Sequence, residues 1–294
     1  MIDSPWLDGR DRYERMMEGW VDNAYDHAFT HTVQIGDDRL RVELSADCTP
    51  SPGYEVLAAR ARVFSDDAAL TTAGRFEELA GARMIGGFTR RLTEVAGSGP
   101  ASRFLVDAGI EVARLARQAA KLPREATAHL ASGGARACWE LDNASWIDLP
   151  GSCFTYSANG RALLDTREVS TPMAVELYSP PPAARRLFVR RKVMRLVRTG
   201  PRLHLFHSMH DNVHGFDIHY EIDLEHDIVV AADSITSRLP YQGICTEPQD
   251  RIDALVGQPV DAGLRKRTQS LLGGEQGCAQ LYDLTADLLK LLSL

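Results

Sequence analysis

One stretch of this chain resembles another stretch 176 residues further along, and this internal similarity constrains the fold more than any other feature. Residues 75–107 align without a gap on residues 251–283, with eight identities in 33 positions, where about two are expected by chance. Repeated sequence is typical of repeated structure. We therefore expect two diverged tandem copies of one structural unit.

Each copy is predicted to contain strands followed by helices. Alternating apolar residues predict strands at 39–44 and 54–57 in the first copy, and at 216–222 and 228–231 in the second. Apolar residues spaced three and four apart then predict a long helix at the end of each copy. This is an α+β fold whose copies pack with pseudo-twofold symmetry.

The rest of the chain frames these copies. We assign residues 1–122 to the first copy, 123–182 to a connecting segment and 183–294 to the second copy, which carries the candidate site. Residues 11–29 are predicted to form a helix, with Met16, Met17, Trp20 and Ala24 on one face. The connecting segment contains several turn signals and large aromatic residues that include Trp139, Trp146, Phe154 and Tyr156, so we expect strands or loops that pack on the second copy or cover its cleft.

Composition excludes several classes of function. The 294 residues carry a formal net charge of -7, whereas nucleic-acid-binding proteins carry a basic surplus. No run of about 18 apolar residues is present, and the N-terminal stretch lacks the features of a signal peptide. The five cysteines include no C-x-x-C pair, which favours reduced thiols. We expect a cytoplasmic protein that acts on a small molecule, without nucleic-acid or membrane partners, and leave a homodimer open.

Histidines are concentrated in the second copy. Six of the nine fall within 23 residues, namely His204, His207, His210, His214, His219 and His226. On a strand, His204 and His210 share one face and His207 takes the other, so the six cannot all converge. His210 and His214 have the spacing of a zinc-binding helix motif, but Gly215 and the alternation after it indicate a turn between strands. We therefore favour His210 or His214 as a metal-free general base oriented by Asp211.

Four further positions offer chemistry. Cys278 follows a glycine-rich turn and opens the last helix, where backbone N–H groups lower a thiol pKa or hold an anion; the alternative is a small buried packing residue. Tyr241 and Cys245 lie in a loop after the strands, where Tyr241 is a candidate hydrogen-bond donor or a packing aromatic. Arg267 lies on a helix and either holds a carboxylate or forms a structural ion pair between the copies.

The second copy resembles the bacterial domain-of-unknown-function family 2889. The resemblance rests on four short motifs, at residues 214–223, 240–245, 255–263 and 272–281. It implies a family site with a histidine at His214 and cysteines at Cys245 and Cys278. The family commonly has Thr-His after the last cysteine, where this chain has Ala279-Gln280, which weakens the case for a metal. Members often occur in bacteria that degrade aromatic or steroid compounds, so the resemblance implies a catabolic role.

These observations lead to one functional expectation and two alternatives. We expect a cofactor-independent carbon-carbon lyase that releases a small aldehyde such as formaldehyde from a lignin-derived phenolic substrate, with no metal. The alternatives are a cysteine-dependent hydrolase or thioesterase, and a non-catalytic ligand-binding protein. The candidate catalytic residues are His210, His214, Asp211 and Tyr241, and the candidate substrate-binding residues are Arg267, Cys245, Cys278, Gln280 and Trp146.

Overall fold

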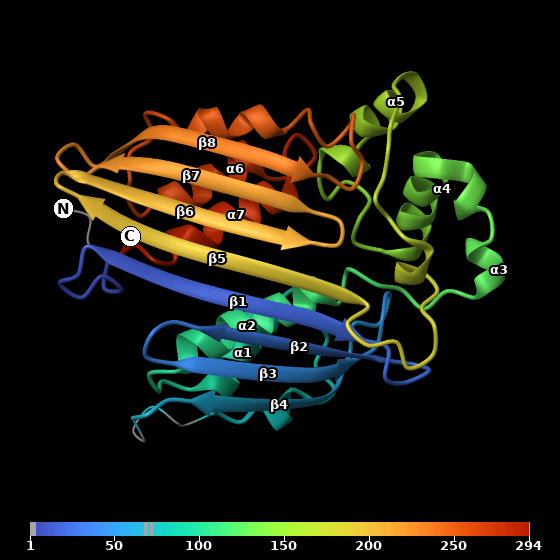
Figure 1. The fold of residues 1–294 in the computed structure, drawn as a ribbon, viewed down its shortest axis with the longest axis horizontal. Coiled ribbons are helices and arrows are strands. Elements are labelled where there is room, and N and C mark those ends of the chain that lie inside the picture. Colours follow the sequence, from blue (N-terminus) through green and yellow to red (C-terminus); the bar gives the residue numbers. More distant parts are fainter. Residues whose placement is uncertain (1–3, 68–69, 71–72, 294) are drawn as a thin grey trace.

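A single antiparallel sheet of eight strands organises the computed structural model, which describes residues 4–67, 70 and 73–293. The strands follow the order β4-β3-β2-β1-β5-β6-β7-β8 (Figure 1). Met1 to Asp3, the start of the stretch considered for a signal peptide, lie outside the described residues. Among the described helices, none is both long and apolar enough to cross a bilayer.

The strands of the two halves meet in the middle of the sheet. The first half contributes β1 (Arg12–Asp22), β2 (Phe29–Gly36), β3 (Arg41–Cys48) and β4 (Val56–Phe64). The second half contributes β5 (Phe188–Thr199), β6 (Arg202–Asp211), β7 (Gly215–Asp223) and β8 (Ile228–Arg238). β1 pairs with β5, with Met17 opposite Lys192. The strands predicted near residues 39–44, 54–57, 216–222 and 228–231 are therefore confirmed.

The helix predicted at residues 11–29 is wrong, because this stretch contains the central strand β1. Its burial alternates along the strand, with Tyr13, Met17 and Val21 on the covered face and Met16 on the other. The four-residue spacing of Met16 and Trp20 fits either structure, because four residues are two full repeats of a strand and close to one turn of a helix. Tertiary pairing with β2 and β5 on both edges decides for the strand.

Four helices cover one face of the sheet and leave the other face open (Figure 1). They are α1 (Phe88–Ala96), α2 (Ser102–Leu115), α6 (Leu264–Leu272) and α7 (Ala279–Leu289). The 3-10 helices η2 (Phe76–Leu79) and η5 (Gln249–Leu255) precede the two pairs. The apolar stripes of α2 and α7 are buried, including Leu105 and Leu284, as their three- and four-residue spacing predicts.

The connecting segment is helical, which corrects the expectation of strands or loops. It contains α3 (Arg124–Thr127), α4 (Leu130–Ser145), η3 (Phe154–Tyr156), α5 (Ala158–Thr166) and η4 (Val175–Leu177), and it stands at one end of the sheet (Figure 1). The turn signal at Gly134 is a break inside α4, where φ is 59°. Glycine adopts this left-handed conformation without steric cost, so the glycine interrupts the helix and does not prevent it.

A buried cluster of charged side chains joins the two halves between α2, α7 and the central strands. Lys192 of β5 forms an ion pair with Glu111 of α2, and each side chain is 5% exposed. Burial raises the pKa of Glu111, but Lys192 and Arg114 outweigh it and bring that pKa to about 2. Asp287 of α7 joins the cluster through Arg114. Buried ion pairs of this kind constrain geometry more than they add stability.

Candidate functional site

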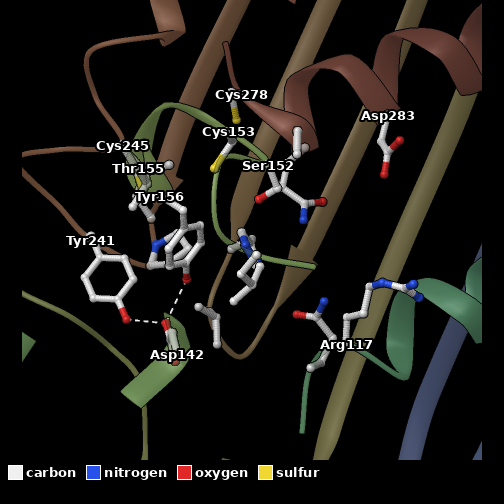
Figure 2. Close-up of a pocket in the computed structure, with 18 of the residues that line it drawn as sticks. Arg117, Asp142, Ser152, Cys153, Thr155, Tyr156, Tyr241, Cys245, Cys278 and Asp283 are labelled. Atoms are coloured by element: carbon white, nitrogen blue, oxygen red, sulfur yellow. Dashed lines mark hydrogen bonds between the residues drawn. The ribbon is translucent and has the colours of Figure 1, made fainter. Parts of the chain in front are cut away.

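A partly open cavity of about 290 Å³ lies where the connecting segment meets the second half. Its walls come from α4, the loop around η3, the β6–β7 turn, the loop after β8 and the start of α7 (Figure 2). The end of α2 closes it from the first half, through Arg114, Arg117 and Gln118. Cavities that combine an apolar lining with a few convergent polar groups are the usual places for small ligands.

His214 is held in the cavity wall by an ionised carboxylate. Its Nδ1 lies 3.1 and 3.2 Å from the two carboxylate oxygens of Asp211. Asp211 also accepts the backbone N–H groups of Val213 (2.8 Å) and His214 (2.6 Å), because it closes the turn between β6 and β7. This arrangement fixes the ring and leaves Nε2 as the nitrogen that can serve a ligand.

Arg190 completes this arrangement from β5. Its Nε donates to Asp211 Oδ2 at 2.8 Å, and both side chains are almost fully buried. Burial raises the pKa of Asp211, but His214 and Arg190 together hold it well below its ordinary value. The carboxylate therefore stays ionised at neutral pH beside the His214 ring.

A second polar centre faces the same cavity, around Asp142 of α4. Its buried carboxylate accepts hydroxyl groups from Tyr178 (2.6 Å), Tyr156 (2.7 Å) and Tyr241. Figure 2 shows the Tyr156 and Tyr241 hydroxyls turned toward Asp142. Burial raises the pKa of Asp142 to about 6, against the lowering effect of the three hydroxyls. This carboxyl group therefore titrates close to neutrality while its tyrosines stay protonated.

The rest of the cavity surface is mainly apolar. Trp146 is 2% exposed, and its indole Nε1 has no hydrogen-bond acceptor among the described residues. A buried donor without a partner costs about 1–3 kcal/mol, so a ligand oxygen or a water that reaches it is favoured. Apolar side chains contribute much of the remaining surface, and polar ones such as Asp148, Ser152 and Asp283 add to it. The apolar residues include Leu149, Met173, Val213, Phe216 and Leu239.

Three thiols line the cavity but are not activated. Burial raises the pKa of Cys278 to about 11, and the N–H groups of Leu281 and Gln280 lower it by less. The expectation that the helix start lowers this pKa is therefore wrong, because desolvation of the thiolate outweighs the backbone N–H groups. Burial also raises the pKa of Cys153 and of Cys245, whose Sγ lies 2.9 Å from the Thr155 hydroxyl.

Most of the expected site residues come together, and two do not. The cavity is lined by His214, Tyr241, Cys245, Cys278, Gln280 and Trp146, with Asp211 directly behind His214.

His210 and Arg267 lie elsewhere. His210 is exposed on the open face of the sheet and 3.5 Å from Asp217, since strand residues alternate between faces and Asp211 takes the covered one. Arg267 is paired with Asp261 at 2.8 Å on the outside of α6. Asp261 belongs to the same copy, so Arg267 forms a local surface ion pair and neither the expected carboxylate-holding role in the cavity nor the alternative of an ion pair between the copies is seen.

Sequence reasoning did not single out Asp142, Tyr156, Cys153 or Arg117. The first three belong to the connecting segment, whose fold was assigned wrongly, and Arg117 follows α2 in the first half. The sequence offered no clear signal for Asp142, because Glu140 is a second acid in the same short stretch between Trp139 and Trp146. Trp139 itself stacks on Tyr156 behind the cavity surface.

Fold and site together define an α+β protein with a partly open, mainly apolar cavity that His214 with Asp211 and the Asp142 cluster of tyrosines both border. A family model described as "Protein of unknown function (DUF2889)" matches residues 198–292, and so confirms the resemblance of the second half. No curated protein and no solved structure matches the chain. The match includes His214, Tyr241, Cys245 and Cys278, whereas Asp142 and its wall of the cavity precede it.

Proposed function

We propose that this protein is a lyase for a small, phenolic, lignin-derived aromatic molecule, from which it releases formaldehyde by acid and base chemistry alone. One observation carries the proposal. A histidine held by an ionised aspartate and a tyrosine held by a carboxyl group whose pKa burial raises to about 6 face one partly open cavity. Environments that separate the proton affinities of two groups in one site are typical of paired acid and base catalysis.

The reaction balances without an oxidant or a reductant. In a substrate with a hydroxymethyl group on the carbon next to a benzylic aryl ether, His214 takes the hydroxymethyl proton. That O–H electron pair forms the carbonyl of formaldehyde as the carbon-carbon bond breaks. The electrons of the broken bond form a double bond to the benzylic carbon, and the aryl oxygen leaves as a phenolate. Tyr241 protonates this oxygen, so the products are an alkenyl phenol and formaldehyde.

Each centre suits its part in this reaction. Asp211 stabilises the imidazolium that His214 becomes. The Tyr241 hydroxyl, which the Asp142 carboxylate orients by accepting its hydrogen bond, turns its proton to the phenolate, and water then returns a proton to Tyr241. Trp146 and Phe216 provide apolar surface for an aromatic ring, and the unpartnered indole N–H offers a donor to a substrate oxygen.

Formaldehyde release from a panel of lignin-type dimers tests this proposal. We expect turnover of members that carry a hydroxymethyl group beside a benzylic ether, and none of members in which that group is methylated at oxygen. His214→Gln should lower kcat by about 10²–10⁴-fold, the usual contribution of a general base. His210→Gln is the matched control, because it lies in the same hairpin on the opposite face. Equal activity of the two variants contradicts the assignment of the base.

The thiol route has weaker support. A cysteine hydrolase needs a thiolate at neutral pH, whereas burial raises the pKa of each cavity-lining cysteine. Tyr241→Phe separates the two mechanisms, because it removes the proposed acid and leaves every thiol in place. We expect a loss of turnover that is largest for substrates with the least acidic leaving phenol.

We also propose that the two halves are diverged copies related by pseudo-twofold symmetry. The bounds of α1, Phe88–Ala96, become those of α6, Leu264–Leu272, when 176 is added. Ion pairs follow the same shift, since Arg114 pairs with Asp283 at 2.9 Å and Lys290 with Asp107 at 3.0 Å. In an experimental structure, superposing residues 12–115 on 188–291 should align strands and helices together. If the strands align only in a superposition that leaves the helices unaligned, the duplication is contradicted.

A further inference from the structure

Two histidines on the open face of the sheet lie side by side, away from the cavity. His204 of β6 and His219 of β7 are 33% and 37% exposed. His204 Nδ1 lies 3.4 Å from His219 Nε2, and the ring planes differ by 12°. The strand pairing fixes this proximity, because Phe206 is the partner of His219 and His204 is two residues before it. The proposed lyase chemistry uses neither ring.

We propose that His204, His219 and Glu221 form a binding site for a borderline divalent metal ion of the Zn²⁺, Ni²⁺ and Cu²⁺ class. Two imidazole nitrogens bound to one tetrahedral ion, at about 2.0–2.1 Å each, lie roughly 3.4 Å apart. The observed nitrogen separation is 3.4 Å. A direct N–H···N hydrogen bond is usually about 2.7–3.2 Å long. The pair is therefore spaced better for a shared ion than for a hydrogen bond.

Carboxylates complete the site. Glu221 is the strand partner of His204, and its Oε2 lies 3.9 Å from His204 Nδ1. Arg202 holds the other oxygen, Oε1, at 3.4 Å, so Oε2 stays directed to the histidines. The Glu221 side chain is 29% exposed, and its rotation must carry Oε2 toward His219 for all three ligand atoms to meet one ion. Imidazole and carboxylate ligands together suit zinc, nickel and copper better than magnesium or calcium.

Asp233 of β8 supports the second histidine from outside. Its Oδ2 lies 3.8 Å from Nδ1 of His219, which is the ring nitrogen that does not face His204. Histidine ligands usually give this second N–H to a carboxylate, which sets the tautomer and the ring orientation. Broad side-chain torsions let both rings turn until their lone pairs converge. The remaining coordination position stays open to water.

Cu²⁺ and Zn²⁺ binding to the full chain, purified without a polyhistidine tag, tests the site. We expect one Cu²⁺ per chain whose electron paramagnetic resonance spectrum shows coupling to two imidazole nitrogens. Zn²⁺ affinity, measured by calorimetry, should fall in His204→Ala and His219→Ala by more than the roughly 10-fold that loss of an outer hydrogen-bond partner costs. Asp233→Asn should weaken binding by about 10-fold.

His226→Ala is the matched control. His226 lies with Asp223 and Glu225 in another group of potential ligand atoms, at the turn between β7 and β8. The His226→Ala variant should bind Cu²⁺ and Zn²⁺ with the same affinity as the unchanged chain. Binding that survives both His204→Ala and His219→Ala, or that disappears in His226→Ala, overturns the proposal. Circular dichroism verifies that the variants are folded, which is expected because all these side chains are at least partly exposed.

Discussion

The two ends of the sheet have the same order of strands and helices, but only one of them holds a candidate site. Subtracting 176 from His214, Tyr241 and Cys278 leads to Asp38, Ser65 and Ser102. Asp38 is an exposed side chain that pairs with Arg10 at 2.6 Å. The comparison teaches that the same order of strands and helices does not require the same side chains, because the residues 176 positions before the cavity residues are of other types.

The cavity exists at one end because the connecting segment stands there and the helices pack differently. In the first half, Gly109 of α2 lets α1 approach so closely that an added Cβ would lie 2.3 Å from Leu92. At the corresponding position of α7, Thr285 donates to the Leu281 carbonyl and contacts the Tyr220 hydroxyl at 2.7 Å. The first half therefore uses close apolar packing where the second half uses polar contacts.

The largest expected difference in the free energy of unfolding is between variants of Arg190 and of Glu14, the residue 176 positions earlier. Arg190→Met leaves the buried Asp211 carboxylate without its main cation, and the free energy of unfolding should fall by about 3–5 kcal/mol. Glu14 forms exposed pairs with Arg195 and Arg12, so Glu14→Gln should cost less than about 1 kcal/mol. Urea unfolding of both variants measures the difference. Equal losses would break the comparison between the halves.

The next effect is a pH dependence that Asp142 confers. Its folded-state pKa of about 6 lies above the ordinary value of 3.8, so the folded protein binds this proton more tightly than the unfolded chain. Stability from this group is therefore full below pH 4 and is lost as pH rises through 6. The change is about 3 kcal/mol for two pH units.

Asp142→Asn removes this titration and keeps an acceptor for the tyrosines. The free energy of unfolding, measured between pH 4 and 7, should decline less in the variant by about 3 kcal/mol. Other groups titrate in both proteins and cancel in the difference. Parallel profiles would show that the three tyrosines hold Asp142 at its ordinary pKa.

Thiol reactivity sharpens the comparison further. A pKa raised from 9.0 to about 11 reduces the thiolate fraction of Cys278 by about 100-fold at pH 8. Iodoacetamide should therefore alkylate Cys278 about 100-fold more slowly than a small free thiol, and Cys48, which is fully buried in the first half, more slowly still. Mass spectrometry of the labelled peptides measures both rates. Rapid labelling of Cys278 alone would favour the cysteine hydrolase.

The smallest expected effect concerns the two helix pairs. Gly109→Ala should lower the free energy of unfolding by about 1–3 kcal/mol, because the new methyl group overpacks against Leu92. Thr285→Val should cost about 0.5–1.5 kcal/mol through loss of its hydrogen bonds. Thermal unfolding of both variants makes the comparison. A stabilising Gly109→Ala would show that α1 can move away from α2.

Sequence reasoning succeeded where local pattern and tertiary context agree. The strands β3 and β7 alternate in burial, and the long helices α2 and α7 carry continuous apolar stripes. It failed at β1, whose residues fit two periodicities, and in the connecting segment, whose glycines were interpreted as turns. For the histidines, the alternation of side chains along a strand was enough to place His207 on the opposite face of the sheet from His204 and His210, and the burial pattern of β6 confirms this.

What the sequence by itself determined is the repeated order of strands and helices, the family resemblance of the second half, and a set of reactive side chains near the β6–β7 turn. Only the tertiary structure decided which of them share a cavity. His210 and Asp211 are neighbours in sequence, yet the strand sends them to opposite faces. Asp142 and Tyr241 are 99 residues apart, yet they share a hydrogen bond. Distance along the chain does not report distance in space, because the packing of α4 against the loop after β8 arises only when the whole apolar core is buried.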